Sequence, residues 1–240
     1  MNKICLLLLA ATSTFSCFAQ DKGMENANNK PYLGLRLSID ASIPTDLKTT
    51  EGSLSTSSNI FGTGGGVALG AVYNIPIVAN LFVEPGVDFY YHTNSINMGN
   101  YFQESDVFNT DFQNRSLRKF GMRIPVEIGY RYDFDSSISA SIFTGPVLNI
   151  GFSNDYCVTT TELEGVKYHD SGSMYYSPLY QMQRANFSWR FGVGVNFLKN
   201  YYVALSGDVG MLNMIKNNSE HLKKSMHENG FQLTLGYNFK

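Results

Sequence analysis

Eight segments of this chain alternate between apolar residues and polar or small residues with a period of two. Successive side chains of a β-strand point to opposite faces, so each segment is predicted to be a strand with one apolar face. In the first segment, Leu35 and Leu37 alternate with Arg36 and Ser38. The predicted strands cover residues 32–43, 64–75, 80–92, 119–132, 137–152, 186–197, 201–211 and 230–239. The alternation therefore predicts an all-β protein.

Prolines interrupt three of these segments, at Pro85, Pro125 and Pro146. Each proline removes a backbone donor from the hydrogen-bond ladder, and proline is normally confined to strand edges and bulges. We therefore expect β-bulges at these three positions.

Charged residues within the predicted strands share the face opposite the apolar one. A soluble eight-stranded barrel of the lipocalin kind also alternates, but it turns its apolar face inward around a ligand. If the apolar face meets lipid instead, this arrangement avoids a cost of about 2–4 kcal/mol for each Lys or Arg near the membrane midplane. The predicted lumen charge network comprises Arg36, Asp40, Glu84, Asp88, Arg123, Glu127, Arg131, Arg190 and Asp208.

Aromatic residues make up 14% of the chain and gather at both ends of the apolar faces. Amphipathic rings favour the headgroup level, and aromatic girdles flank the apolar band of outer-membrane barrels. One predicted belt contains Tyr73, Tyr130, Tyr132, Phe197, Tyr201, Tyr237 and Phe239. The other contains Phe89, Tyr91, Phe120, Phe152, Phe187, Trp189 and Phe231.

The links between the predicted strands alternate between long and short. Long links cover residues 44–63, 93–118, 153–185 and 212–229, whereas residues 76–79, 133–136 and 198–200 form short ones. Short periplasmic turns and long extracellular loops are typical of outer-membrane barrels. We therefore predict an eight-stranded antiparallel up-and-down transmembrane β-barrel in the cell outer membrane, with both termini in the periplasm.

The first nineteen residues have the pattern of a secretory signal peptide. A positive charge at Lys3 precedes an apolar run, and small residues lead to Ala19, after which we expect cleavage. The predicted organisation is a signal peptide at 1–19 and one barrel domain at 20–240. Cys17 raises the alternative of a lipoprotein, although Thr14 stands where a lipobox usually carries Leu. After cleavage Cys157 is the remaining cysteine, so no intramolecular disulfide is expected.

Several short motifs give the chain a family resemblance. They are the signal ending at residues 18–20 (Phe-Ala-Gln), residues 82–86 (Phe-Val-Glu-Pro-Gly), residues 123–126 (Arg-Ile-Pro-Val), residues 144–146 (Thr-Gly-Pro) and residues 236–239 (Gly-Tyr-Asn-Phe). With these motifs the chain resembles the PorT-like outer-membrane β-barrel proteins of Bacteroidota over essentially its whole mature length. The resemblance implies a barrel fold and an outer-membrane location, and we carry no activity over from it.

Two functions follow from the predicted lumen. Eight strands enclose an interior that side chains can fill, and four Arg with five carboxylates nearly balance in charge. Paired charges favour a closed structural or interaction protein that presents surface loops, because unpaired buried charge is costly. The alternative is a narrow pore for small solutes or ions. The third long loop is rich in Tyr and Met, which suits contacts with an envelope or surface partner or packing over the barrel mouth.

Other classes of function find little support in the sequence. His92 and the run His169-Asp170-Ser171 are the candidates for an enzymatic site, but nothing in the sequence brings them within hydrogen-bond reach, so we expect no enzyme. The spacing of Cys, His and acidic residues matches no zinc or calcium site. No basic cluster suggests nucleic acid as a partner, and no cofactor is expected; outer-membrane lipid is the expected contact.

Overall fold

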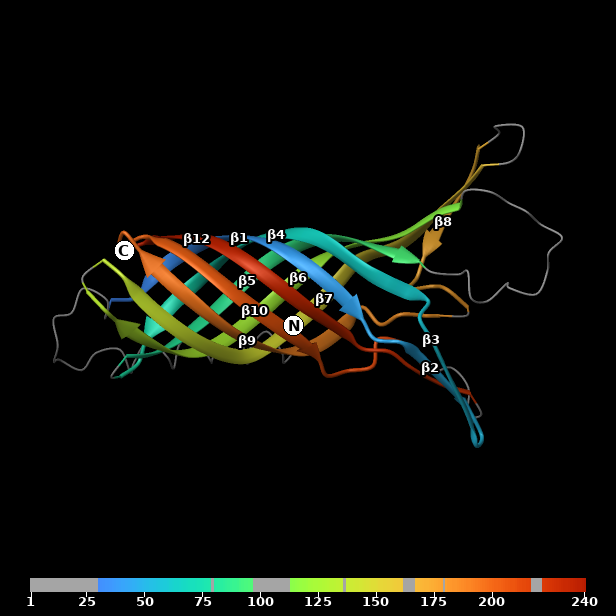
Figure 1. The fold of residues 1–240 in the computed structure, drawn as a ribbon, viewed down its shortest axis with the longest axis horizontal. Coiled ribbons are helices and arrows are strands. Elements are labelled where there is room, and N and C mark those ends of the chain that lie inside the picture. The colour runs from blue at the N-terminus through green and yellow to red at the C-terminus, as the bar shows by residue number, and fades with distance from the viewer. Residues whose placement is uncertain are drawn as a thin grey trace, which may run out of the picture.

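Eight strands form a closed antiparallel barrel in the computed structural model, which describes residues 30–78, 80–96, 113–135, 137–161, 167–178, 180–216 and 222–240. The predicted signal peptide lies outside these described residues. The barrel strands are β1 (Tyr32–Pro44), β4 (Phe61–Pro76), β5 (Leu81–Ile96), β6 (Gln113–Asp133), β7 (Ser139–Thr161), β9 (Ala185–Phe197), β10 (Tyr201–Gly210) and β12 (Glu228–Phe239). Their order is β6-β5-β4-β1-β12-β10-β9-β7, and the pairing of β6 with β7 closes the ring (Figure 1). The predicted eight-stranded barrel is confirmed.

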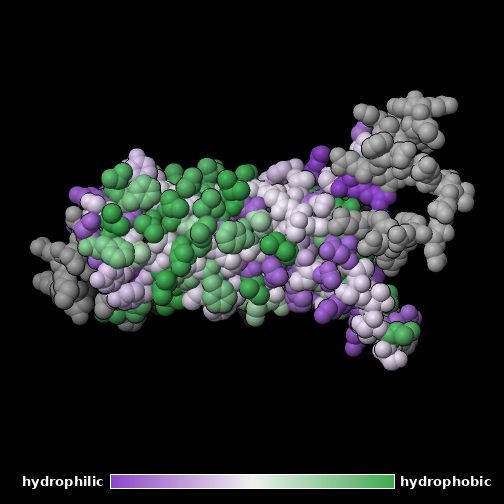
Figure 2. Space-filling view, viewed as in Figure 1, coloured by the Kyte–Doolittle hydropathy of each residue, from purple (hydrophilic) through white to green (hydrophobic). Residues whose placement is uncertain are grey.

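The apolar face of the barrel points outward. At mid-height Leu37 is the register partner of both Leu69 and Leu235, and these side chains are 52%, 62% and 51% exposed. Their neighbours Arg36 and Ser38 are buried in the lumen. Figure 2 shows the resulting apolar surface along the barrel wall. This polarity is the reverse of a lipocalin-like barrel, whose apolar face would enclose a ligand.

Aromatic rings meet one another at two levels of the outer surface. Tyr201 lies 5.5 Å from Tyr237 between ring centroids, near the end where β12 finishes. Phe152 contacts Phe89 and Phe120 near the opposite end, at 6.5 and 5.6 Å. The rings thus occur at both ends of the apolar wall, as the sequence predicts.

The expectation of bulges at the three prolines is wrong. Pro85 pairs with Val126 and Asp88 with Arg123, so the register is the same on both sides of the proline. Pro125 and Pro146 likewise lie within an unshifted register. A missing N–H weakens one position of a ladder but adds no residue, and for that reason no change of register is needed.

Register shifts occur instead at two other places in the barrel wall. In the β6–β7 pair, Phe120 is opposite Ser153 and Gly121 is opposite Gly151, which leaves Phe152 as the extra residue. A second register shift lies between Phe61 and Gly64 in the β4–β5 pair.

The two ends of the barrel differ in how their strands are joined. Short links join β4 to β5, β6 to β7 and β9 to β10 at one end of the barrel, called here the turn end. The third turn needs positive backbone φ at Leu198 (50°) and Lys199 (68°). The opposite end, called here the loop end, carries the long links. No helix in the described part of the chain is long and apolar enough to cross a membrane.

The long links contain regular structure that the alternation did not predict. Strands β2 (Leu47–Glu51), β3 (Leu54–Ser58) and β11 (Leu222–Ser225) form a small three-stranded sheet, and β8 (Lys167–Ser173) extends the barrel beside β7. These elements project past the loop end in Figure 1. A buried apolar cluster, called here the loop cap, packs at the loop end: Leu47, Ile60, Phe61, Leu117, Met174, Tyr175, Met182, Met214, Ile215 and Met226.

Candidate functional site: the charged lumen

The nine residues of the predicted lumen charge network all lie inside the barrel. Arg190 on β9 is central among them, with a side chain that is 5% exposed. Its Nε and Nη2 donate to the two carboxylate oxygens of Asp208 at 2.7 and 2.8 Å, and its Nη1 donates to Glu127 Oε1 at 3.3 Å. This arginine therefore joins carboxylates of β10 and β6, and its bidentate pair fixes its orientation.

Arg123 on β6 makes a second junction, nearer the loop end. It donates to Asp88 Oδ1 and to Asp40 Oδ2, both at 2.8 Å. The same Asp40 oxygen lies 2.9 Å from His92 Nε2. One aspartate of β1 is thereby tied to β5 and β6 through a single oxygen, Oδ2, whereas its Oδ1 is buried without a hydrogen-bond partner among the described residues.

Arg36 makes a third junction, nearer the turn end. It contacts Glu84 at 3.3 Å, donates to Asn238 Oδ1 at 2.8 Å, and lies 4.3 Å over the ring of Tyr202. A Cβ on Gly34 or Gly236 would come within 2.5 or 2.7 Å of the guanidinium. Both glycines therefore leave the room that this long side chain needs.

Arg131, the last of the four predicted arginines, is held mainly by aromatic rings. Its Nη2 donates to the phenol of Tyr32 at 2.7 Å, and its guanidinium lies 4.9 Å over Phe82. Cation–π contact of a desolvated guanidinium is worth about 2 kcal/mol or more. Arg131 lies in the interior as predicted, but aromatic residues contact its guanidinium and no carboxylate does so among the described residues.

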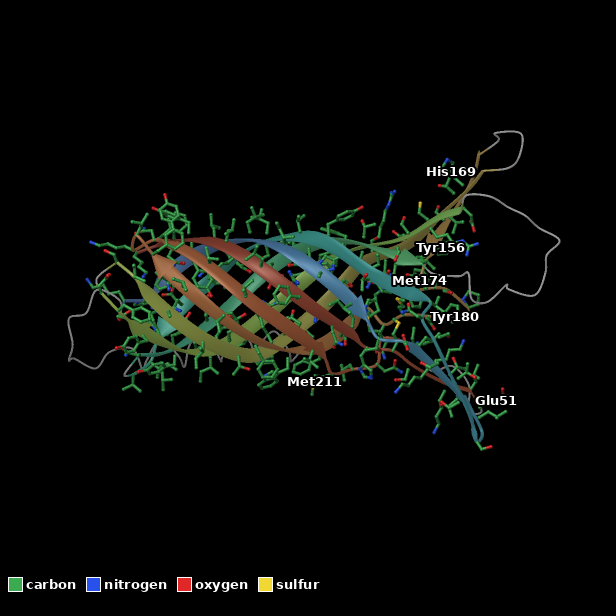
Figure 3. The ribbon with its side chains drawn as sticks, in the orientation of Figure 1. Glu51, Tyr156, His169, Met174, Tyr180 and Met211 are labelled. Atoms are coloured by element: carbon green, nitrogen blue, oxygen red, sulfur yellow. The ribbon has the colours of Figure 1, made fainter. Side chains whose placement is uncertain are left out.

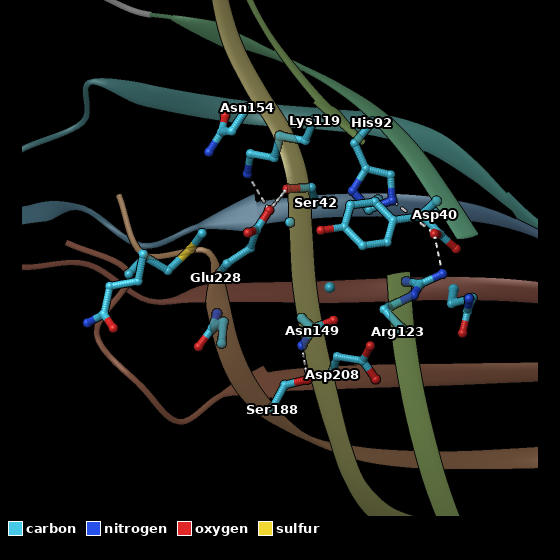
Figure 4. A pocket seen from close by; sticks show the side chains of 18 of the residues that line it. Asp40, Ser42, His92, Lys119, Arg123, Asn149, Asn154, Ser188, Asp208 and Glu228 are labelled. Carbon is cyan, nitrogen blue, oxygen red and sulfur yellow. Dashed lines mark hydrogen bonds and ion pairs between the residues drawn. The ribbon is translucent and has the colours of Figure 1, made fainter. Parts of the chain in front are cut away.

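Lys119 and Glu228 form an ion pair that the sequence reasoning missed. Lys119 Nζ donates to Glu228 Oε1 at 2.5 Å, and the hydroxyl of Ser42 also donates to that oxygen (Figure 4). Glu228 lay outside the predicted last strand, which started at residue 230. It has the same parity as lumen-facing Gln232, so extending the alternation by two residues finds it.

The network leaves little open space inside the barrel. A cavity of about 70 Å³ lies near the loop end between Lys119, Arg123 and Glu228. A second one, of about 40 Å³, lies nearer the turn end between Arg36, Glu84 and Arg190. Spaces of this size hold a few water molecules.

The residues considered for an enzymatic site lie on different parts of the molecule. His92 faces the lumen and is bound to Asp40. His169 lies on the exposed β7–β8 hairpin, where its Nδ1 is 3.0 Å from Thr159 Oγ1 (Figure 3). Within the described ranges, no group of three or more His, Cys, Asp or Glu is placed to hold a metal ion.

Some Tyr and Met side chains of the third long loop are buried, and others are exposed to solvent. Met174, Met182 and Tyr175 are buried in the loop cap, whereas Tyr176 is 75% exposed. Burial raises the pKa of the Tyr175 phenol to about 12. Most of the Tyr and Met side chains described in this loop therefore pack over the barrel mouth, and Tyr176 faces solvent.

A closed eight-stranded barrel that is apolar outside and ion-paired inside, with long links at one end, has the architecture of an outer-membrane β-barrel protein. The chain belongs to the outer membrane protein beta-barrel domain family, whose model matches residues 6–239. It is therefore a small outer-membrane β-barrel protein, and its apolar outer face contacts lipid. The PorT-like group and a source in Bacteroidota stay predictions.

Solved structures of other small outer-membrane barrels match this chain, and the likeness in fold rests on the first of them. The outer membrane protein OprG from Pseudomonas aeruginosa is 10% identical, with a TM-score of 0.51 over 88% of this chain and 97% of that chain. Neisserial surface protein A is 12% identical over 85% and 95% of the two chains, with a TM-score of 0.35. Ail of Yersinia pestis, solved with the heparin analogue sucrose octasulfate, is 12% identical over 86% and 99%, with a TM-score of 0.30. A comparison with curated protein sequences gave no significant match.

Proposed function

We propose that this protein is a closed barrel that serves as a structural or interaction protein and presents its loop end to a partner at the cell surface. In this proposal the lumen charge network, extended by Lys119, Glu228 and His92, acts as a plug. It holds the eight strands together and blocks passage through the lumen.

The Lys119–Glu228 ion pair is the observation that carries the proposal. Three strands separate β6 from β12 in either direction around the ring: β5, β4 and β1 on one side, and β7, β9 and β10 on the other. The pair therefore crosses the lumen between opposite walls. Its side chains are 6% and 20% exposed, so the contact is largely removed from water.

Charge pairing along the lumen supports a plug over a channel. Arg36, Arg123 and Arg190 each bind at least one carboxylate within 3.3 Å. Separating one of these pairs would leave a buried charge uncompensated, at a cost of about 3–5 kcal/mol. A mobile ion entering the lumen would have to displace such partners.

The proposed orientation places the turn end in the periplasm and the loop end outside the cell. Short turns on the periplasmic side and long loops on the outer side are the usual arrangement. It puts residue 240 in the periplasm and agrees with export by a signal peptide at 1–19. We extend the proposal to membership of the PorT-like group, on the motifs quoted above, and to the absence of enzymatic activity.

Single-channel conductance in planar lipid bilayers tests the plug. We expect refolded wild-type protein to give no discrete conductance. Lys119→Ala and Arg123→Ala each remove the cation of one of the two ion-paired groups nearest the loop end. We expect brief channel openings from each variant and more frequent openings from the double variant. The matched control is Lys223→Ala, which removes an exposed cation from β11, outside the barrel.

Steady, discrete openings of the wild-type protein would overturn the plug and establish the narrow-pore alternative. Silence of the double variant would also count against the plug, because it would show that something other than these ion pairs closes the lumen.

A further inference from the structure

A separate and larger cavity lies in the loop region, outside the lumen. Its volume is about 380 Å³, within the range of sites that hold small organic molecules. Figure 3 shows three of its lining residues, Tyr156, Met174 and Tyr180, beyond the loop end of the barrel. Neither the plug nor the family assignment accounts for this space.

One wall of the cavity is the part of the sheet that continues past the barrel. Arg115 of β6 is the register partner of Val158 of β7, which is the partner of Asp170 of β8. All three line the cavity. Neighbouring strands are about 4.8 Å apart, so the backbones of Arg115 and Asp170 are separated by about 10 Å, with an apolar side chain between them.

The facing wall is apolar and ordered by ring packing. Phe61 and Tyr180 meet edge to face with their centroids 6.1 Å apart, and Phe61 is 4% exposed. Met174, 5% exposed, lines the same wall. Thioether and aromatic groups adapt well to apolar ligands of different shapes.

Arg115 and Asp170, the two charged residues of the sheet wall, are available to a ligand. Arg115 Nε is buried and has no hydrogen-bond partner among the described residues. The side chain of Asp170 is exposed, and no ion pair joins it to Arg115 among those the described residues form. A buried N–H without an acceptor is destabilising, and an anionic ligand near the guanidinium would supply the missing negative charge.

We propose that this cavity binds a short apolar zwitterion of dipeptide size, with its carboxylate at Arg115, its ammonium group at Asp170 and its side chains against Phe61 and Tyr180. An extended dipeptide spans about 7 Å, so with a hydrogen bond of about 3 Å at each end its reach is of the same scale as the separation of about 10 Å between the two backbones. The assignment adds a ligand to the loop region and does not depend on whether the lumen conducts.

Isothermal titration with the dipeptide phenylalanyl-leucine, using the whole barrel refolded in lipid nanodiscs, tests the proposal. We expect saturable binding with one site per barrel. Arg115→Gln and Asp170→Asn are each expected to weaken it at least tenfold. Arg118→Gln is the matched control, because Arg118 lies exposed on the same strand and does not line the cavity. We expect it to leave the affinity unchanged.

Modified ligands make the test independent of any effect of the variants on folding. The N-acetylated and C-amidated dipeptides each lose one charge and should bind at least tenfold more weakly to wild-type protein. Equal affinity for the charged and doubly capped dipeptides would overturn the proposal, since it would indicate partition into lipid or unspecific apolar contact. Absence of saturable binding would overturn it as well, and it would leave the conductance result untouched.

Discussion

Replacing Arg190 by methionine should destabilise the barrel far more than replacing an exposed charged residue outside the barrel. Methionine keeps an unbranched side chain but removes the guanidinium. The carboxylates of Asp208 and Glu127, which accept from it at 2.7, 2.8 and 3.3 Å, then face each other in a lumen largely closed to water. Breaking a buried pair in this way costs about 3–5 kcal/mol, and we expect the free energy of unfolding to fall by that amount.

The single tryptophan makes the measurement direct. Trp189 points outward beside Arg190 and is 36% exposed, so its fluorescence reports the transfer of the barrel wall from lipid to water. Urea titration of the protein folded into lipid vesicles gives the free energy of unfolding for wild type and Arg190→Met. The exposed control Lys223→Met should stay within about 0.5 kcal/mol of wild type.

A compensated variant separates unpaired charge from lost packing. In Arg190→Met combined with Asp208→Leu and Glu127→Met, no charge of the triad remains, so most of the lost stability should return. If Arg190→Met alone stays within about 1 kcal/mol of wild type, the reasoning is refuted, because the triad would then contribute no more than a surface ion pair.

Three further predictions use other parts of the molecule. Leu37→Arg, at mid-height of the outer wall, should cost about 2–4 kcal/mol in the same titration, whereas Leu54→Arg, outside the barrel on β3, should change stability by less than about 0.5 kcal/mol; equal effects would argue against lipid contact at Leu37. Gly145→Ala should destabilise by about 1–3 kcal/mol, because its Cβ would lie 2.1 Å from the carbonyl oxygen of Val126; an unchanged urea midpoint would contradict this close approach. Mass spectrometry of the exported protein should show cleavage after Ala19, whereas a lipid-modified cysteine at the new terminus would establish the lipoprotein alternative.

The barrel wall could be predicted from sequence because its signal is local. Each outward residue such as Leu37 lies between two inward ones. Once the facing of one residue is known, the facing of every other residue in the strand follows. The inward positions of Arg36, Asp40 and Arg190 follow from that parity alone. The same rule also reaches Lys119 and Glu228, and Glu228 was missed only because the predicted end of its strand was too short.

The loop cap could not be predicted in the same way. Leu47, Leu117, Met182 and Met226 are far apart in sequence, and no periodic pattern connects them. Their packing depends on where four long links meet, which local sequence does not encode. The bulge at Phe152 was missed for a related reason, because register is a property of two strands and a proline in one of them does not determine it.

The partners of the charged side chains in the lumen could be predicted only in part. Parity placed Arg131 inside, but it could not show that Tyr32 and Phe82 would hold it in preference to a carboxylate. Such pairing depends on the relative height of residues on strands that are not neighbours in sequence.

The pairing of β1 with β12 determines the order in which this molecule can be assembled. Leu33 is opposite Phe239 and Ile43 is opposite Asn229, so the first barrel strand has its second partner only when the eighth is in place. In hydrocarbon, each backbone group left without a partner costs several kcal/mol, and until that moment both β1 and β10 would have a bare edge. Insertion before the eighth strand has arrived is therefore strongly opposed. A chain stopped short of β12 should remain on the periplasmic side as a substrate for proteolysis, and completion of synthesis itself becomes the quality check on entry into the membrane.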